Sequence, residues 1–250
     1  WDSALVGGSR HPLPFVDKVI YRIIKDEATY LTALRTGQLD ILEAIRWIAV
    51  DHLKETTPEL QWNRWLATSG QFIALRVDQK PFDDLRVRRA LNLAVNQQEI
   101  VKHFYGGHAE LMAYPQHPEF GAYFEPLEDM PESVQQLFSY DPEEARRLLK
   151  EAGVPEGFAF EMQVCSCSPS HMDLVPLLES YFSKVGLKAN IRPLEYASFL
   201  SAMTTKTHGP AYLLSSGHVN PMTTIRKSFV TGQTWNPSQY SDPAFYEKVR

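Results

Sequence analysis

The sequence of 250 residues lacks several features that mark specialised classes of protein. It has no apolar run approaching the ~20 residues that a membrane-spanning helix needs. Basic residues are not in excess, because the formal net charge is −5, and this argues against a surface that binds nucleic acid. The N-terminal stretch WDSALVGGSRHPLP has neither a basic region nor an apolar core, so no signal peptide is expected in it.

Cysteine is scarce, and the only two cysteines, Cys165 and Cys167, are one residue apart. Disulfide geometry disfavours so small a loop, so we expect two free thiols at the end of a strand. A zinc site needs further ligands at suitable spacing, and none adjoins this pair. The eight histidines form no HExxH-like pair, so we expect no metal and no other cofactor.

Motifs typical of enzymes are also missing. The chain has no G-x-S-x-G, no P-loop and no G-x-G-x-x-G. Cys167 and His171 have a spacing compatible with a nucleophilic dyad, but nothing in the sequence indicates an activated thiol or an oxyanion site. We therefore expect no enzymatic activity and no catalytic residues.

The second half of the chain has a clear alternation of strands and helices. Residues 158–164 predict a strand, residues 171–184 an amphipathic helix and residues 187–193 a second strand, which together form a β-α-β unit with parallel strands. A helix over 195–204 and a strand over 211–215 continue the alternation. This pattern predicts an α/β fold.

Other elements are expected along the chain, and residues 105–140 are expected to form a long loop. Helices are predicted after Asp26, over 49–55, after Asp83 or Asp84, and after Asp141, and strands over 16–24, 39–42, 60–67 and 71–77.

Five stretches of the chain resemble family 5 of the solute-binding proteins, the dipeptide, oligopeptide and nickel binding subunits of ABC importers. They are VDKVIYRIIKDEATYLTALRTGQLDI, PFDDLRVRRALNLAVNQQEIV, the YGG of 105–107, YDPEEARRLLKEAGVPEGF and YFSKVGLKANI. Each stretch is weak evidence by itself. Their order and spacing, over nearly the whole chain, carry the resemblance.

The resemblance implies a type II periplasmic-binding fold, in which two α/β lobes with mixed sheets flanked by helices close on a ligand by hinge motion. Family members are longer, so we expect an incomplete chain, cut at both ends. Residues 1–75 would form the middle section of domain I and residues 78–250 most of domain III. Some apolar surface of residues 1–75 should then be exposed.

The resemblance also implies a function. The full-length protein would be exported to the periplasm or the cell surface, capture a small solute in an interdomain cleft and deliver it to ABC permease subunits. The solute would be a peptide, a modified peptide, a sugar or a carboxylate. The protein would act as a monomer without nucleic acid. The alternative is a stand-alone ligand-sensing or interaction domain without a transport role.

Ligands of open α/β sheets bind outside the carboxyl ends of the strands. The loops after strands 158–164 and 211–215, which read CSCSPSH and SSGHVNP, are therefore expected to face the cleft. The expected ligand-binding residues are Arg76, Cys167, Ser168, Ser215, Ser216, Gly217, His218 and Asn220. The alternative for His218 is that it lies in a turn and does not contact the ligand.

The sequence departs from the family pattern at two positions that bear on the ligand. Peptide-binding members have an Asp that pairs with the α-ammonium of the peptide, and Gly217 stands at that position here. A buried ammonium without a carboxylate is costly, so we predict weak binding of unmodified dipeptides. Arg76 replaces the usual Asn in segment 71–78, the expected hinge strand, where it would bind an anionic ligand or be held in a surface ion pair.

Overall fold

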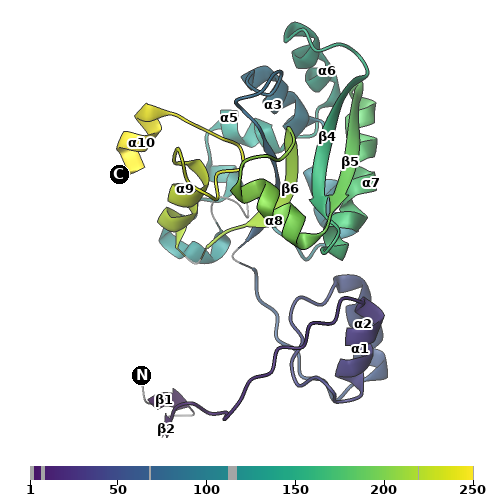
Figure 1. Cartoon of the computed structure of the whole chain (residues 1–250), viewed down its shortest axis with the longest axis vertical. Coiled ribbons are helices and arrows are strands. Elements are labelled where there is room, and N and C mark those ends of the chain that lie inside the picture. Colours follow the sequence, from purple (N-terminus) through teal and green to yellow (C-terminus); the bar gives the residue numbers. More distant parts are fainter. Residues whose placement is uncertain (1–2, 7–8, 68, 112–116, 219, 250) are drawn as a thin grey trace. The chain divides into compact units, whose positions relative to one another are not determined.

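The structure is a computed structural model that describes residues 3–6, 9–67, 69–111, 117–218 and 220–249. By internal packing it divides into two units, Trp1–Ile45 and Arg46–Arg250, each of which is described by itself (Figure 1). The domain division predicted at residues 75–78 stays a prediction. Among the described residues, no helix combines the length and the apolar character needed to cross a membrane.

The smaller unit contains a hairpin and a helix. Strands β1 (Ser3–Val6) and β2 (Ser9–Pro12) pair in antiparallel orientation, and α1 (Glu27–Arg35) follows. Asp26 caps α1 as predicted, because its Oδ1 accepts the backbone N–H of Thr29 at 2.8 Å. Beyond the helix, Gly37 has a φ of 69°, a left-handed conformation that glycine adopts without steric cost.

The strands predicted over 16–24 and 39–42 are not formed. Segment 16–24 is irregular and pairs with no strand among the described residues, and the side chains of Tyr21 and Ile23 are 91% and 92% exposed. Alternation alone does not make a strand, because its backbone groups need a neighbour to bond with. These residues confirm the expected exposure of apolar surface in the first 75 residues, together with Phe15, Val16, Val19, Ile20, Ile41, Ile48, Trp62 and Trp65.

The larger unit contains a four-stranded mixed sheet of order β3–β6–β4–β5. Its strands are β3 (Gly70–Leu75), β4 (Phe158–Cys165), β5 (Leu187–Leu194) and β6 (Ala211–Ser216). Strand β4 runs parallel to both β5 and β6, and β3 pairs antiparallel with β6. Helix α7 (Pro169–Lys184) joins β4 to β5, which confirms the predicted β-α-β unit.

Helices cover both faces of this sheet (Figure 1). On one face α3 (Leu85–Leu93), α6 (Pro142–Glu151) and α7 pack in one hydrophobic core with Met162 and Leu213 of the sheet. On the other face α8 (Tyr196–Thr204) buries Met203 against Tyr212. Leu213 and Tyr212 face opposite ways because successive side chains of a strand alternate. The result is the mixed α/β layer architecture that the sequence predicted.

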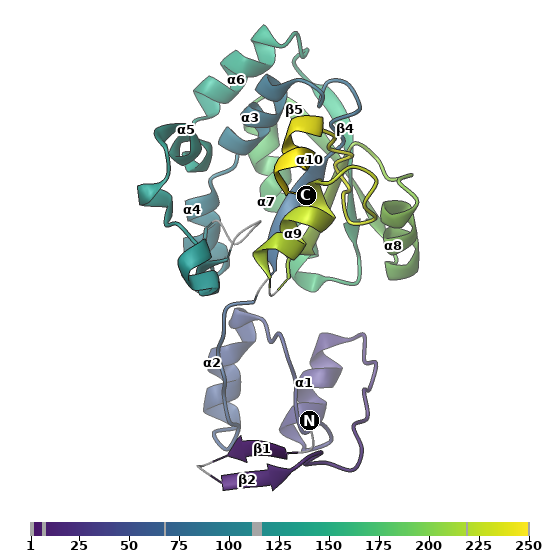
Figure 2. The same ribbon diagram turned by 90° about the vertical axis from the view of Figure 1, so that its left-hand side faces the viewer.

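The other elements are short or peripheral. The predicted strand over 60–67 is not formed, and the predicted long loop 105–140 contains several short helices. Helices α9 (Pro221–Phe229) and α10 (Pro243–Val249) lie beside β3 (Figure 2). Side chains from all three elements line one hollow. The rest are α2 (Trp47–Thr56), α4 (Gln97–Glu99), a π-helical turn (Ile100–Phe104), α5 (Glu132–Gln135) and 3-10 turns at Pro118–Tyr123, Leu127–Asp129 and Gln136–Phe138.

Candidate ligand-binding site

The carboxyl ends of β4, β5 and β6 meet at one edge of the sheet, which we define as the site edge. Cys165 lies opposite Leu194 of β5, and Val164 lies opposite Leu213 of β6. The loops 165–168 and 215–220 therefore leave the sheet at the same edge. The first residues of β3 join them there, since Gly70 pairs with Ser216. The structure thus brings together the two loops that the sequence predicted to contact the ligand.

Two of the predicted ligand-binding residues also begin helices. The Oγ of Ser168 accepts the backbone N–H of His171 at 3.4 Å and caps α7. The Oδ1 of Asn220 accepts the backbone N–H of Thr223 at 3.3 Å and caps α9. Both polar atoms are therefore engaged locally, as Ser and Asn commonly are at this position. Of the remaining predicted residues, Ser215 and Cys167 are exposed, and Ser216, Gly217 and His218 are half-buried.

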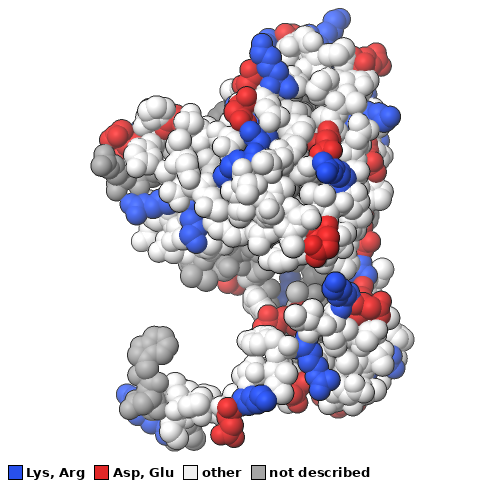
Figure 3. Space-filling view, viewed as in Figure 1, with Lys and Arg blue, Asp and Glu red and all other residues white. Residues whose placement is uncertain are grey.

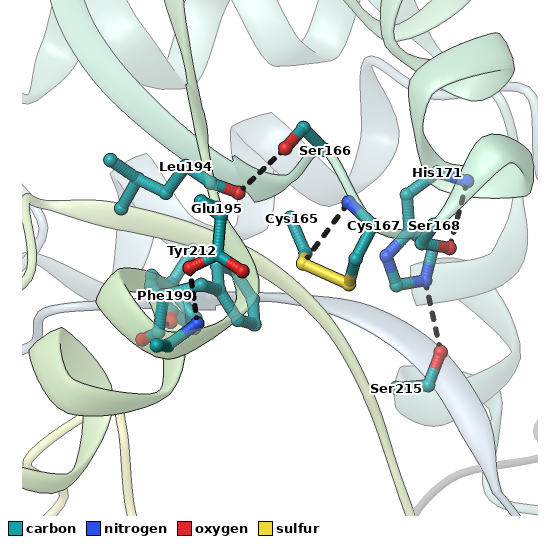
Figure 4. The surroundings of a disulfide bond; sticks show 11 residues. Cys165, Ser166, Cys167, Ser168, His171, Leu194, Glu195, Phe199, Tyr212 and Ser215 are labelled. Atoms are coloured by element: carbon teal, nitrogen blue, oxygen red, sulfur yellow. Dashed lines mark hydrogen bonds between the residues drawn. A yellow bond between two sulfur atoms is a disulfide. The ribbon is translucent and has the colours of Figure 1, made fainter. Parts of the chain in front are cut away.

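One contact joins the two loops directly. The Nε2 of His171 and the Oγ of Ser215 are 3.0 Å apart, so α7 and the end of β6 are tied by a hydrogen bond (Figure 4). The His171 side chain is buried, and its Nδ1 has no hydrogen-bond partner among the described residues. Burial lowers the pKa of His171. The imidazole is therefore neutral near pH 7 and acts by hydrogen bonding rather than by charge.

His218 has a related electrostatic environment. Its pKa is lowered, first by partial burial and then by the positive charge of Lys227. Both imidazoles of the site edge are thus uncharged near pH 7. Val219 lies outside the described residues, so the loop is described on either side of it.

The site edge also contains three polar residues that the sequence analysis did not indicate. The Oη of Tyr105 donates to the Oε1 of Gln71 at 2.6 Å, and burial raises the pKa of Tyr105. Glu195 follows β5, is exposed, and caps α8 by accepting the backbone N–H of Ala197 at 2.8 Å. The rule that points to strand ends would have found Glu195 had it been applied to the strand at 187–193 as well.

The cysteines form a disulfide, contrary to the expectation of two free thiols. The chain turns sharply at Ser166, whose backbone N–H and Oγ both donate to the carbonyl oxygen of Leu194, at 2.9 and 3.0 Å. This turn brings the Cα atoms of Cys165 and Cys167 to 5.1 Å, within the range that a disulfide spans. Cys165 is buried and Cys167 is exposed.

Arg76 does not lie at the site edge. It follows Leu75, which pairs with Ala211 at the start of β6, so it lies at the opposite end of the strands, defined here as the back edge. Its Nε and Nη2 donate to the carboxylate of Asp78, both at 2.7 Å. Its Nη1 donates to the carbonyl oxygens of residues 206 and 208, at 3.0 and 3.3 Å. The structure corrects the expected placement of Arg76, and the ion-pair reading is the one that fits.

Two surface hollows lie away from the site edge. One, of about 420 Å³, is lined by Lys80, Asp83 and Pro155, and the other, of about 510 Å³, by Leu75, Phe229 and neighbouring apolar side chains. Neither includes a residue of loops 165–168 or 215–220. Both hollows are therefore separate from the site edge.

Among the described residues, neither the surface charge in view nor the metal-ligating side chains form a cluster. Acidic and basic side chains are interspersed on the face of residues 46–250 in view in Figure 3, without a field of one sign. Within the described ranges, no group of three or more His, Cys, Asp or Glu side chains is arranged to hold a metal ion.

The larger unit is a mixed sheet between helices, with polar loops at the carboxyl ends of its strands, which is where open α/β proteins bind ligands. The family model for bacterial extracellular solute-binding proteins, family 5 (middle), matches residues 10–237. The chain belongs to this family. Solved structures of type II periplasmic binding proteins share its fold.

Three comparisons illustrate the family. The chain is 31% identical to di/tripeptide-binding protein 1 of Pseudomonas aeruginosa, over 81% of this chain and 37% of the relative. It is 28% identical to heme-binding protein A of Haemophilus influenzae, over 74% and 33%. The oligopeptide-binding protein AppA of Bacillus subtilis, solved with a nonapeptide, aligns with a TM-score of 0.77 at 17% identity, over 91% and 46%. The chain thus spans less than half the length of each.

Proposed function

We propose that the chain is part of an extracytoplasmic solute-binding subunit of an ABC importer, located in the periplasm or at the cell surface. It captures a small polar solute at the site edge, and the whole protein delivers that solute to ABC permease subunits. The observation that carries the proposal is the convergence of loops 165–168 and 215–220 at the carboxyl ends of β4 and β6 in a chain of this family. Transport distinguishes this role from that of a stand-alone sensing domain.

The protein binds its solute without converting it. The relatives above are named as binding proteins, which supports this reading. A Cys167–His171 dyad would need a free thiol, and Cys167 is joined to Cys165. It acts as a monomer. Its net charge of −5 argues against nucleic acid as a partner.

The solute class follows from the polar groups available. Ser215, Ser216 and His218 offer hydroxyls and a neutral imidazole, and loop 215–220 has no carboxylate. Such groups suit a modified peptide, a sugar or a carboxylate rich in hydrogen-bond acceptors. Unmodified dipeptides should bind weakly, because an ammonium finds no carboxylate at Gly217. Glu195 is the acidic side chain at the site edge that could pair with an ammonium instead. One of its oxygens already accepts a hydrogen bond at the start of α8.

The test is calorimetric titration of the full-length protein with unmodified dipeptides, N-acetylated dipeptides, sugars and small carboxylates. We expect the acetylated or acidic solutes to bind at least about tenfold more tightly than the free dipeptides. Submicromolar binding of free dipeptides that is weakened by Glu195→Gln would assign the ammonium to Glu195 and contradict the predicted preference. Uptake by cells that lack the protein, compared with complemented cells, tests the transport role separately.

A further inference from the structure

The disulfide places a reactive bond within the candidate ligand-binding site. Cys165 and Cys167 close a very small loop, and a disulfide of this kind constrains the unfolded chain far less than one that closes a long loop. Stabilising the fold is therefore a poor explanation for it. The exposed side chain of Cys167 lies in the loop that carries Ser168, next to the contact between His171 and Ser215 (Figure 4).

We propose that this disulfide captures a small cysteine-containing peptide by thiol–disulfide exchange, so that the solute is held by a reversible covalent bond at the site edge. The inference rests on the proposed solute-binding function and adds the chemical class of the solute. The peptide brings its own thiol, so the exchange needs no further reductant.

The exchange balances as a single substitution at sulfur. The thiolate of the peptide attacks the Sγ of Cys167, the bond between Cys167 and Cys165 breaks, and the electron pair of that bond leaves on Cys165 as a thiolate. The product is a mixed disulfide between the peptide and Cys167. In the reverse step, the Cys165 thiolate attacks the Cys167 Sγ, restores the original disulfide and releases the peptide thiolate. Release for transport therefore needs no external reagent.

The structure distinguishes the two sulfur atoms. Cys167 is exposed, whereas Cys165 is 3% exposed and lies at the end of β4, so an incoming thiolate reaches Cys167. The Sγ of Cys165 accepts the backbone N–H of Cys167 at 3.3 Å, a contact that favours negative charge on that sulfur. The pair also directly precedes α7, whose positive N-terminal end favours a thiolate on either sulfur. Attack at the exposed Cys167 makes Cys165 the leaving group, and the N–H of Cys167 stabilises its charge.

The neighbouring groups suit the peptide part of such a solute. Ser215 and Ser216 lie at the end of β6, the strand beside β4, and Glu195 follows β5. Hydroxyls bind peptide carbonyl and N–H groups without selecting a sequence. The thiol then supplies the selectivity that these neutral groups lack.

The experiment compares three probes on the full-length oxidised protein: reduced glutathione, S-methylglutathione and 2-mercaptoethanol. Samples are acid-quenched and analysed by intact-mass and peptide-mapping mass spectrometry. We expect a single glutathione adduct on Cys167, a rate of formation that saturates with glutathione concentration, and no adduct with S-methylglutathione. At equal thiolate concentration, glutathione should react at least about tenfold faster than 2-mercaptoethanol, a ratio that reports recognition of the peptide part.

Two variants keep the test decisive. Cys165→Ala/Cys167→Ala, with its fold checked by circular dichroism, should form no adduct. Cys165→Ser leaves a free thiol on Cys167, and treatment with glutathione disulfide should give an adduct that, unlike that of the unsubstituted protein, does not release its peptide spontaneously. Equal, non-saturating rates with glutathione and 2-mercaptoethanol would overturn the proposal, as would an adduct on Cys165 or no adduct.

Failure of this inference differs from failure of the proposed function. Tight binding of other solutes, with no glutathione adduct, would remove the covalent step and leave the solute-binding role in place. Absence of binding across the whole solute panel, in protein that is folded and oxidised, would remove the proposed function itself.

Discussion

The site edge and the back edge are two ends of the same four strands, and they carry different chemistry. At the back edge, Arg76 and Asp78 are ionised and joined by two hydrogen bonds, and Arg76 also donates to two carbonyl oxygens. At the site edge, His171 and Ser215 are neutral, and the polar atoms of the loops are only partly engaged. An ion pair whose hydrogen bonds are complete holds its loops in place. Polar groups with unused donors or acceptors can instead bind a solute.

The largest effect is expected from Arg76→Ala. This change leaves the Asp78 carboxylate and two carbonyl oxygens without their donor, and the Arg76 side chain is only 11% exposed. The free energy of unfolding should fall by about 2–3 kcal/mol, measured by urea denaturation. Solute affinity should not change, because Arg76 lies away from the site edge.

The matched control for Arg76 is Arg192→Ala. Arg192 pairs with Glu161 at 3.4 Å, but its side chain is 58% exposed, so its loss should cost less than about 0.5 kcal/mol. The opposite result is an Arg76 variant that is as stable as the control but binds the solute more weakly. It would show that Arg76 contacts the ligand and that the two edges do not differ in function.

The next effect concerns pH and the back edge. The pKa of His208 is lowered, chiefly by burial and further by the charges of Arg76 and Lys206. The folded protein therefore binds fewer protons than the unfolded chain just below pH 6.5, and stability falls as the pH drops through that range. The contribution reaches at most about 1.4 kcal/mol per pH unit. Above the unfolded pKa it vanishes, because His208 is neutral in both states.

The variant that isolates this contribution is His208→Asn. The Nδ1 of His208 contacts the carbonyl oxygen of Gly209 at 2.9 Å, and an Asn side chain can keep a donor near that position. Unfolding of both proteins should be followed from pH 8 to pH 5. The difference in stability between them should change with pH below 6.5. A difference that stays constant would show that His208 has the same pKa in the folded and the unfolded protein.

At the site edge, the effect should appear in binding. His171→Ala removes the hydrogen-bond partner of Ser215, and His218→Ala removes a neutral imidazole from loop 215–220. Each substitution should weaken binding of the solute by about 1–2 kcal/mol, which is roughly a tenfold rise in Kd, measured by calorimetry. His171→Gln, which can keep a polar atom near Ser215, should recover part of the affinity. Unchanged affinity in both alanine variants would remove these two groups from the site.

The sequence predicts best those elements whose partners are close along the chain. The β-α-β unit joins strands within residues 158–194, so its pattern contains both halves of the pairing. Segment 16–24 has the same kind of pattern, but no strand lies beside it among the described residues. Periodicity reports which side chains are apolar, whereas a strand also requires a neighbour for its backbone.

The same limit applies to the site. The rule for strand ends located loops 165–168 and 215–220 because β4 and β6 are parallel. Arg76 was placed at the site by the family resemblance and not by this rule, and the placement was wrong because β3 runs antiparallel to β6 and ends at the back edge. The disulfide was missed because the turn at Ser166 depends on a long-range contact with the carbonyl oxygen of Leu194 in a neighbouring strand.

The smallest effect is expected from Tyr105→Phe. The change removes the hydroxyl that donates to Gln71 at 2.6 Å and keeps the ring, which packs edge-on against Phe104 with the ring centroids 4.8 Å apart. Gln71 is exposed, so water can replace the lost donor, and the free energy of unfolding should fall by only about 0.5 kcal/mol. The Kd of the solute should rise by less than about threefold, because Gln71 is freed rather than removed. Thermal unfolding and calorimetry check the two values. A loss of more than about 2 kcal/mol would mean that this contact holds the start of β3 in place, as Arg76 holds its end, and the two edges would then differ in charge but not in structural role.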